Sequence, residues 1–304
     1  MPQSVVTKTI VYYLIGYLLS FYAYANTSDR SKRLINETHR DIKFIKTSQL
    51  KPSTQNRLAL VIGNSNYQNV GSLSNPQNDA RDMADALSRV GFQVLYQQNS
   101  TNRSMAEAVE SFGEHLKQNK GVGLFYYAGH GIQVEGKNYL LPVDATINKT
   151  SDIRFETMDL ARILETMAAA DNSLNIVILD ACRNNPFSNS FRSIQRGLAQ
   201  INAPSGTLLA YATAPGDVAA DGTGRNGIYT KYLLRYLETP GLSIEALFKK
   251  ARRGVMFETQ NNQVPWESSS LVDEFYFASS DSESLDLCNF AQINQRPISC
   301  LFRG

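Results

Sequence analysis

Charge bias is missing from this sequence, and so are the patterns that mark nucleic-acid or nucleotide binding. The 304 residues include 30 Lys and Arg against 28 Asp and Glu, for a net charge of +2. The basic residues are spread along the chain without a run of about five or more, which gives no electrostatic reason to expect a nucleic-acid partner. The glycine-rich phosphate loop of nucleotide-binding proteins and repeats of about 20–50 residues are missing too.

A dense acidic loop with the ligand spacing of a Ca²⁺ site is also lacking. We therefore expect Asp144, Asp152 and Glu156 to be solvated. The sequence predicts neither a bound metal nor a cofactor, and it leaves a requirement for Ca²⁺ open.

Cysteine is scarce, with three residues in the whole chain. Cys288 and Cys300 lie 12 positions apart in a C-terminal tail, 280–304, and could close a small disulfide loop in an exported protein. Cys182 is then the unpaired thiol. The alternative, in which all three are reduced, stays open.

The N-terminus indicates export. Lys8 precedes an apolar segment of 16 residues, 10–25, which ends in Ala23-Tyr24-Ala25. A charged start, an apolar centre and a small-residue end are typical of a secretory signal peptide. The segment is short for a membrane span, which needs about 20 apolar residues. We predict a periplasmic or secreted protein with residues 1–25 as the signal peptide, and no other membrane contact; an uncleaved anchor at 10–25 is the alternative.

After a polar linker, 26–56, apolar strand patterns and amphipathic helix patterns alternate. The hydrophobic share of 42% and the charged share of 19% suit an ordinary globular core. We expect strands at 58–63, 92–99, 122–131, 175–180, 207–216 and 274–279, a hairpin or crossing loop at 136–145, and helices at 78–91, 104–118, 157–170, 227–238 and 243–258. This alternation predicts one α/β domain at 57–279, with a mostly parallel sheet between helices.

Two chemically active residues end neighbouring strand patterns. Cys182 follows the strand at 175–180, and His130 stands within Ala-Gly-His-Gly at the end of 122–131. Each alone is explained as a structural residue, since free Cys is often buried. A parallel sheet, however, brings both strand ends to one edge, where open α/β proteins build their sites. A thiol beside an imidazole becomes a thiolate, so together they predict a nucleophile with its general acid. His39 and His115 are expected to be solvated.

These segments carry a resemblance to a known family. The His and Cys motifs are YYAGHG (126–131) and LDACRNNPF (179–187), and His130 and Cys182 are 52 positions apart. The supporting segments are RLALVIGNSNY (57–67), NDARDM (78–83), YATAPG (211–216) and PWESSSLVDEFYF (265–277). The chain resembles the caspase-like cysteine peptidases, in particular the bacterial metacaspase and paracaspase-like branch.

The resemblance implies the caspase-hemoglobinase fold, with a six-stranded sheet between helices. It also implies a His130–Cys182 dyad and an oxyanion hole made by the backbone N–H groups of Gly131 and Cys182. The caspase signature QACxG is replaced by Asp180-Ala181-Cys182-Arg183, which argues against the specificity of animal caspases.

Three aspartates predict the opposite specificity. Caspases cut after Asp because arginines line their pocket, and the corresponding positions here hold Asp79 and Asp221, while Asp180 matches an acidic pocket position of metacaspases. Three carboxylates in one pocket would bind Arg, then Lys, and not Asp. The structural alternatives are a helix N-cap for Asp79, a strand-end acceptor for Asp180 and an Asp-Gly turn for Asp221.

The sequence therefore predicts an exported cysteine endopeptidase, expected to be monomeric, that cleaves peptides or proteins after a basic residue. Arg192 and Arg196 lie in the polar loop 183–206 after the nucleophile, where such an enzyme could cut itself. Two alternatives remain: a caspase-fold scaffold or binding module without activity, and a dyad that hydrolyses another amide or an ester.

Overall fold

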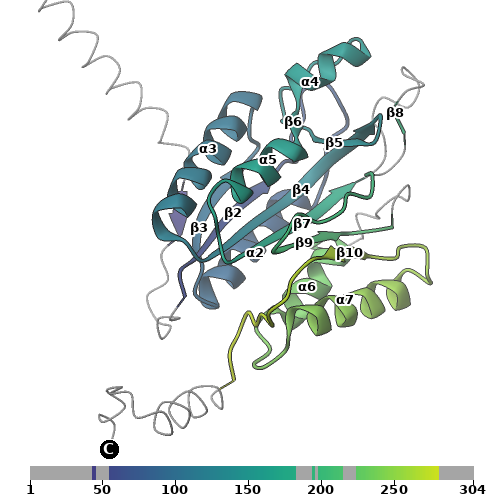
Figure 1. The fold of residues 1–304 in the computed structure, drawn as a ribbon. Coiled ribbons are helices and arrows are strands. Elements are labelled where there is room, and N and C mark those ends of the chain that lie inside the picture. The colour runs from purple at the N-terminus through teal and green to yellow at the C-terminus, as the bar shows by residue number, and fades with distance from the viewer. Residues whose placement is uncertain (1–42, 46–54, 183–193, 196–197, 215–223, 281–304) are drawn as a thin grey trace, which may run out of the picture. The chain divides into compact units, whose positions relative to one another are not determined.

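The structure of this chain is a computed structural model that describes residues 43–45, 55–182, 194–195, 198–214 and 224–280 (Figure 1). The predicted signal peptide, Asp221, the loop arginines Arg192 and Arg196, and the tail cysteines lie outside these residues. Predictions about them stay predictions.

A mostly parallel sheet forms the centre of the described part of the chain. Its strands run in the order β1-β3-β2-β4-β7-β9-β10. Their bounds are β1 Lys43–Ile45, β2 Arg57–Gly63, β3 Gln93–Gln98, β4 Val122–Val134, β7 Leu174–Cys182, β9 Thr207–Tyr211 and β10 Trp266–Ser269. The five strands from β3 to β9 are mutually parallel, and β1 and β10 are added antiparallel at the two edges. The predicted α/β class is confirmed, and β1 shows that part of the predicted linker joins the sheet.

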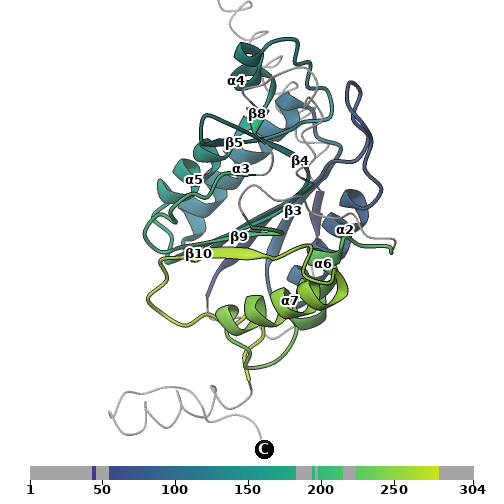
Figure 2. The same cartoon turned by 90° about the vertical axis from the view of Figure 1, so that its right-hand side faces the viewer.

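Helices cover both faces of this sheet (Figures 1 and 2). Their bounds are α2 Pro76–Arg89, α3 Asn102–Asn119, α4 Ile153–Glu156, α5 Leu160–Ala168, α6 Ile228–Leu237 and α7 Ile244–Glu258. α2, α6 and α7 share a buried core with alternate strand residues such as Val61, Leu124 and Ile176. α3 and α5 pack on the other face (Figure 1). The strands are buried on both faces, as expected for the all-apolar runs of a parallel sheet.

The strand β4 continues beyond the main sheet and carries a small second one. Its end turns back through Glu135 and Gly136, both with positive φ, into the antiparallel strand β5, Lys137–Leu140. The short strands β6, Met158–Asp159, and β8, Ile194–Gln195, pair with β5 and β4 respectively. Of the two alternatives for 136–145, the hairpin is therefore the one that forms.

The strand expected at 274–279 is not part of the sheet, and this prediction was wrong. The edge strand is β10, which pairs with β9. Residues 274–279 form isolated bridges at Tyr276 and Ala278, while Phe275 and Phe277 are buried in the core. The alternation of aromatic residues that predicted a strand is real, but it reflects an extended segment that packs its rings without joining a ladder.

Candidate active site

The ends of β4 and β7 lie side by side at one edge of the sheet. The two strands are parallel neighbours, and their register pairs Ala128 with Asp180, Gly129 with Ala181 and His130 with Cys182. Neighbouring strands lie about 4.8 Å apart. The structure describes Cys182 through its backbone, so this register is what brings the predicted pair to the same level of the same edge.

The backbone of His130 is held at the point where β4 runs past β2. The pairing of β2 with β4 ends at Gly63 and Ala128. Two residues further on, the His130 N–H donates to the hydroxyl of Tyr67 at 2.7 Å, and the His130 carbonyl accepts from the Leu141 N–H at 3.0 Å. The Tyr67 hydroxyl and the Leu141 N–H thus take the place of β2 at His130, while β7 remains paired on the other side.

The imidazole of His130 is buried and oriented by a backbone carbonyl. Nε2 lies 2.7 Å from the carbonyl oxygen of Gly71, and the ring packs against the Tyr67 ring with centroids 4.6 Å apart. A carbonyl oxygen can only accept, so Nε2 carries the hydrogen. In the neutral ring, Nδ1 is then the nitrogen that can take up and return a proton.

Gly131 directs its N–H toward the end of β7. The Ala128 carbonyl accepts from the Asn64 N–H at 2.9 Å, and the His130 backbone bonds to Tyr67 and Leu141, on the β2 side of the strand. Successive residues of a strand point their backbone groups to opposite neighbours. The N–H of Gly131 therefore faces the β7 side, just beyond Cys182.

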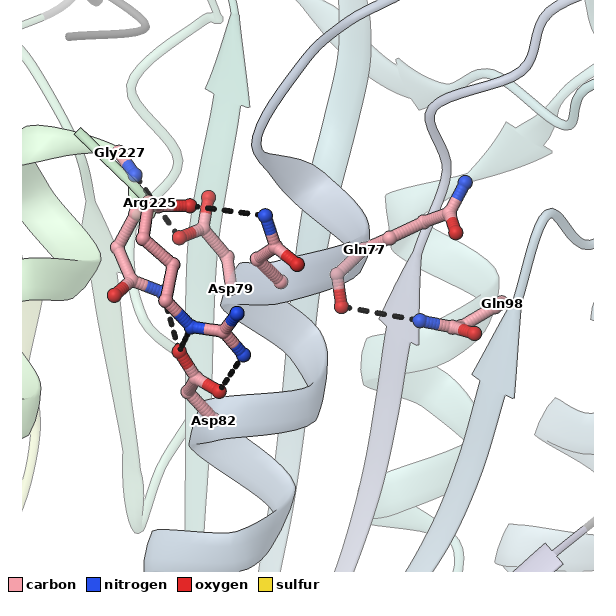
Figure 3. A network of polar contacts seen from close by, with 8 residues as sticks. Gln77, Asp79, Asp82, Gln98, Arg225 and Gly227 are labelled. Carbon is pink, nitrogen blue, oxygen red and sulfur yellow. Dashed lines mark hydrogen bonds and ion pairs between the residues drawn. The ribbon is translucent and has the colours of Figure 1, made fainter. Parts of the chain in front are cut away.

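Two of the three predicted pocket aspartates converge on the N-terminus of α6. Asp79, in the first turn of α2, accepts from the Gly227 N–H at 2.9 Å (Figure 3). Asp180 accepts from the N–H and the hydroxyl of Thr230, at 3.3 and 2.6 Å. A Cβ placed on Gly227 would lie 3.2 Å from Oδ2 of Asp79 and 3.4 Å from Oδ2 of Asp180. The two carboxyl groups therefore flank one glycine.

The two carboxyl groups are electrostatically unfavourable neighbours. Asp79 is 3% exposed, and burial, followed by the neighbouring charge of Asp180, raises its pKa from 3.8 to about 8. Hydrogen bonds from Asn226 and Gly227 oppose this rise only in part. Burial and the neighbouring Asp180 therefore favour the protonated form of the Asp79 carboxyl.

The structural alternatives for these aspartates have different outcomes. α2 begins at Pro76 with Asn75 as its N-cap, so the N-cap role considered for Asp79 is wrong; a proline in the first turn starts the helix earlier. Asp180 is indeed a strand-end acceptor, toward Thr230. Asp221 lies outside the described residues.

Side chains of α2 also hold the segment that leads into α6. Asp82, one turn after Asp79, binds the Arg225 guanidinium through two hydrogen bonds of 2.8 and 2.9 Å (Figure 3). It also accepts from the Asn226 side chain at 2.9 Å. These contacts fix Gly227 beside Asp79.

Sequence reasoning missed the groups that orient His130 and Asp180. Gly71 acts through its backbone carbonyl, and because every residue has one, the residue type gives no indication of this role. Tyr67 belongs to the quoted segment 57–67, but its distance from His130 in the chain gives no sign of their contact. Thr230 accepts from the Tyr126 hydroxyl at 2.6 Å while donating to Asp180, and nothing in the helix pattern of 227–238 indicates this.

Two negative findings apply to the described residues. No group of three or more His, Cys, Asp or Glu side chains in them is arranged to hold a metal ion. Within the same part of the chain, no helix is both long and apolar enough to cross a membrane.

A family model described as the caspase domain matches residues 56–276. The chain therefore belongs to the caspase domain family, a family of cysteine peptidases, and the resemblance predicted from its motifs is confirmed.

Among curated proteins, the chain is 31% identical over 217 residues to the human mucosa-associated lymphoid tissue lymphoma translocation protein 1. The match covers 69% of this chain and 25% of the human protein. The mouse homolog is 30% identical over 200 residues, 64% of this chain and 23% of that protein. Rat caspase-1 is 21% identical over 262 residues, 81% of this chain and 64% of that protein. The chain thus spans about a quarter of the length of the first two relatives.

Proposed function

We propose that this chain is a cysteine endopeptidase whose His130 and Cys182 act as a catalytic dyad. The observation that carries the proposal is the strand register that sets the two residues opposite each other at one sheet edge. Membership of a peptidase family supports it independently.

In the proposed reaction, the Cys182 thiolate attacks the carbonyl carbon of the scissile bond and forms a tetrahedral oxyanion. The N–H groups of Gly131 and Cys182 stabilise this oxyanion, a contribution typically worth about a hundredfold in rate or more. Collapse of the intermediate breaks the C–N bond, and His130 donates a proton from Nδ1 to the leaving amine. Water, deprotonated by His130, then hydrolyses the thioester and releases Cys182.

We propose Arg, and then Lys, as the residue before the cleaved bond. The support is the pair of carboxyl groups, Asp79 and Asp180, that flank Gly227. Asp180 lies two residues before Cys182 in β7. A guanidinium offers the planar fork that two carboxylates bind best. Asp221 completes the pocket in this proposal.

Fluorogenic peptides ending in Arg, Lys or Asp test the function, each with and without Ca²⁺. The expected result is cleavage after Arg and Lys, no cleavage after Asp, and no activity in Cys182→Ala. Cleavage after Asp would overturn the specificity. No cleavage of any peptide, together with a Cys182 that does not react with an alkylating agent, would favour a scaffold module.

The active enzyme is also expected to cut its own loop at Arg192 or Arg196. Wild type should then give two fragments on a denaturing gel, whereas Cys182→Ala stays intact. An active wild-type enzyme that runs as a single band would refute self-cleavage.

We further propose that the protein is exported and monomeric. Export rests on the N-terminal segment 1–25, with 10–25 as an anchor if it is not removed. Mass spectrometry of the protein recovered outside the cytoplasm should find its first residue at Asn26. A protein retained in the cytoplasm would contradict export.

A further inference from the structure

The two hydroxyls of Tyr67 and Tyr127 form a bridge around the backbone of His130. Tyr67 is 7% exposed and Tyr127 is fully buried. Their hydroxyl oxygens lie 3.2 Å apart. Tyr127 is also 2.9 Å from the carbonyl oxygens of both His130 and Leu141, and Tyr67 accepts from the His130 N–H. Both backbone groups of His130 therefore bond to this pair.

The direction of these hydrogen bonds follows from the available protons. The two carbonyl oxygens near Tyr127 can only accept, so its single O–H points to them. In the bond between the hydroxyls, Tyr67 is then the donor. The hydrogen bonds therefore form a closed circuit at His130. The His130 N–H donates to the Tyr67 hydroxyl, the Tyr67 hydroxyl donates to the Tyr127 hydroxyl, and the Tyr127 hydroxyl donates to the His130 carbonyl.

The residue before His130 leaves room for this bridge. A Cβ on Gly129 would lie 2.5 Å from the Tyr127 hydroxyl and 2.6 Å from that of Tyr67. Both distances are too short for a real contact, so the glycine is required for the two hydroxyls to meet.

The same loop that carries Tyr67 also carries the carbonyl that orients the imidazole. Tyr67 and Gly71 are four residues apart, and the loop is closed by the Leu73 N–H, which donates to the Ser65 carbonyl at 3.1 Å. The hydroxyl of Tyr67 thus fixes the loop to the His130 backbone, and Gly71 then reaches Nε2 at 2.7 Å.

From these contacts we propose that Tyr67 is a positioning residue for the reaction: its hydroxyl, backed by Tyr127, holds His130 and the Gly71 carbonyl in register with Cys182. This inference rests on the proposed function of the dyad. Tyr67 acts through His130, whose backbone N–H it binds and whose ring it packs against, and its contribution is to alignment.

The test compares Tyr67→Phe with Tyr139→Phe in the full-length protein. Tyr139 lies in the same buried apolar cluster as Tyr67 but does not belong to the bridge formed by the Tyr67 and Tyr127 hydroxyls. A misplaced catalytic group is costly even at small displacements. For an Arg peptide, Tyr67→Phe should therefore lower kcat about 10- to 100-fold with KM changed by less than about threefold. Tyr139→Phe should leave both unchanged.

A second readout needs no peptide. The rate at which iodoacetamide modifies Cys182, followed by mass spectrometry across pH, reports the thiolate fraction. In wild type the midpoint should lie below the ordinary thiol value of about 8.5, and in Tyr67→Phe it should move toward that value.

The outcomes separate the two proposals. A wild type without peptide cleavage and with an ordinary Cys182 thiol contradicts the dyad itself. An active wild type, with a folded Tyr67→Phe of equal kcat and equal alkylation profile, overturns the positioning role. If Tyr67→Phe does not fold, Tyr127→Phe carries the same test: it should lower kcat, and an unchanged kcat overturns the proposal.

Discussion

At the scale of single residues, Asp79 is the group that works against folding. An acid that is 3% exposed beside a second carboxyl keeps its proton to a pH of about 8. The unfolded chain would release that proton near 3.8. Strongly shifted groups of this kind are typical of functional sites, where stability is given up for binding or catalysis.

We predict that Asp79→Asn stabilises the protein and that the gain depends on pH. Between pH 4 and 8 the folded state holds a proton that the unfolded state has lost, so the wild-type free energy of unfolding falls through this window as the pH rises. Asparagine does not titrate in this range, so the free energy of unfolding of the variant does not fall in this way. Denaturant unfolding should show a gain on the order of a few kcal/mol at pH 8 and a smaller one at pH 5.

Asp82→Asn is the matched control, one turn along the same helix. The hydrogen bond from Arg225 holds the pKa of Asp82 below its ordinary value, so its ionised form favours the folded state. This variant should lose stability at neutral pH. If Asp79→Asn is also less stable than wild type at pH 8, the buried carboxyl of Asp79 does not destabilise the folded state.

Binding of cations in the proposed pocket should also depend on pH. Asp79 must release its proton before it can pair with a guanidinium or an amidinium. The inhibition constant of benzamidine, a small amidinium, should therefore fall as the pH rises from about 7 to 9, around the pKa of about 8. The same slope in Asp79→Asn would show that another group is responsible.

At the scale of elements, the site depends on how closely α2 approaches β2. Gly63 ends β2, and a Cβ there would clash with the Pro76 carbonyl and lie 2.6 Å from the Ala80 Cβ. This glycine lets the first turn of α2, with Asp79, lie against the strand. Asp79 and Asp82 then bind Gly227 and Arg225 at the start of α6.

Gly63→Ala should therefore push α2 away from β2. We expect a loss of about 1–3 kcal/mol in stability, as for other overpacked cores, together with a raised KM for Arg peptides because Asp79 moves. Gly113→Ala is the control, since its Cβ would meet only the side chain of Thr166. It should leave KM unchanged. An unchanged KM in a folded Gly63→Ala would show that substrate binding does not depend on the close packing of α2 against β2.

Most elements could be predicted from the sequence because their patterns are local. The buried strands 58–63 and 122–131 and the helix 243–258 have periodicities that leave little choice, and the structure has all three. The prediction of a strand at 274–279 failed because alternating aromatic residues indicate which side chains are buried, not whether the backbone pairs with a neighbouring strand. Likewise, the sequence could point to His130 and Cys182 by residue type, but it could not find Gly71, whose role lies in its carbonyl.

At the scale of the whole molecule, the parallel sheet, covered by helices on both faces, is what would allow the proposed dyad to form. Two strands from distant parts of the chain, β4 and β7, are buried as neighbours, and their parallel register brings His130 and Cys182 to one level. The helices of one face then add a carboxyl from α2 and the N-terminus of α6 beside the same edge. In the proposed enzyme, this one arrangement of strands and helices would therefore place both the dyad and the carboxyl groups of the specificity pocket.

The most direct measurement is kcat/KM for an Arg peptide in wild type, His130→Ala, Cys182→Ala and the double variant. Residues that act as one unit lose nearly all their effect when either is removed. Each single variant should fall by about a thousandfold or more, and the double variant should be no worse than the singles. A His130→Ala enzyme that keeps activity within about tenfold of wild type, or losses that add in the double variant, would contradict the dyad.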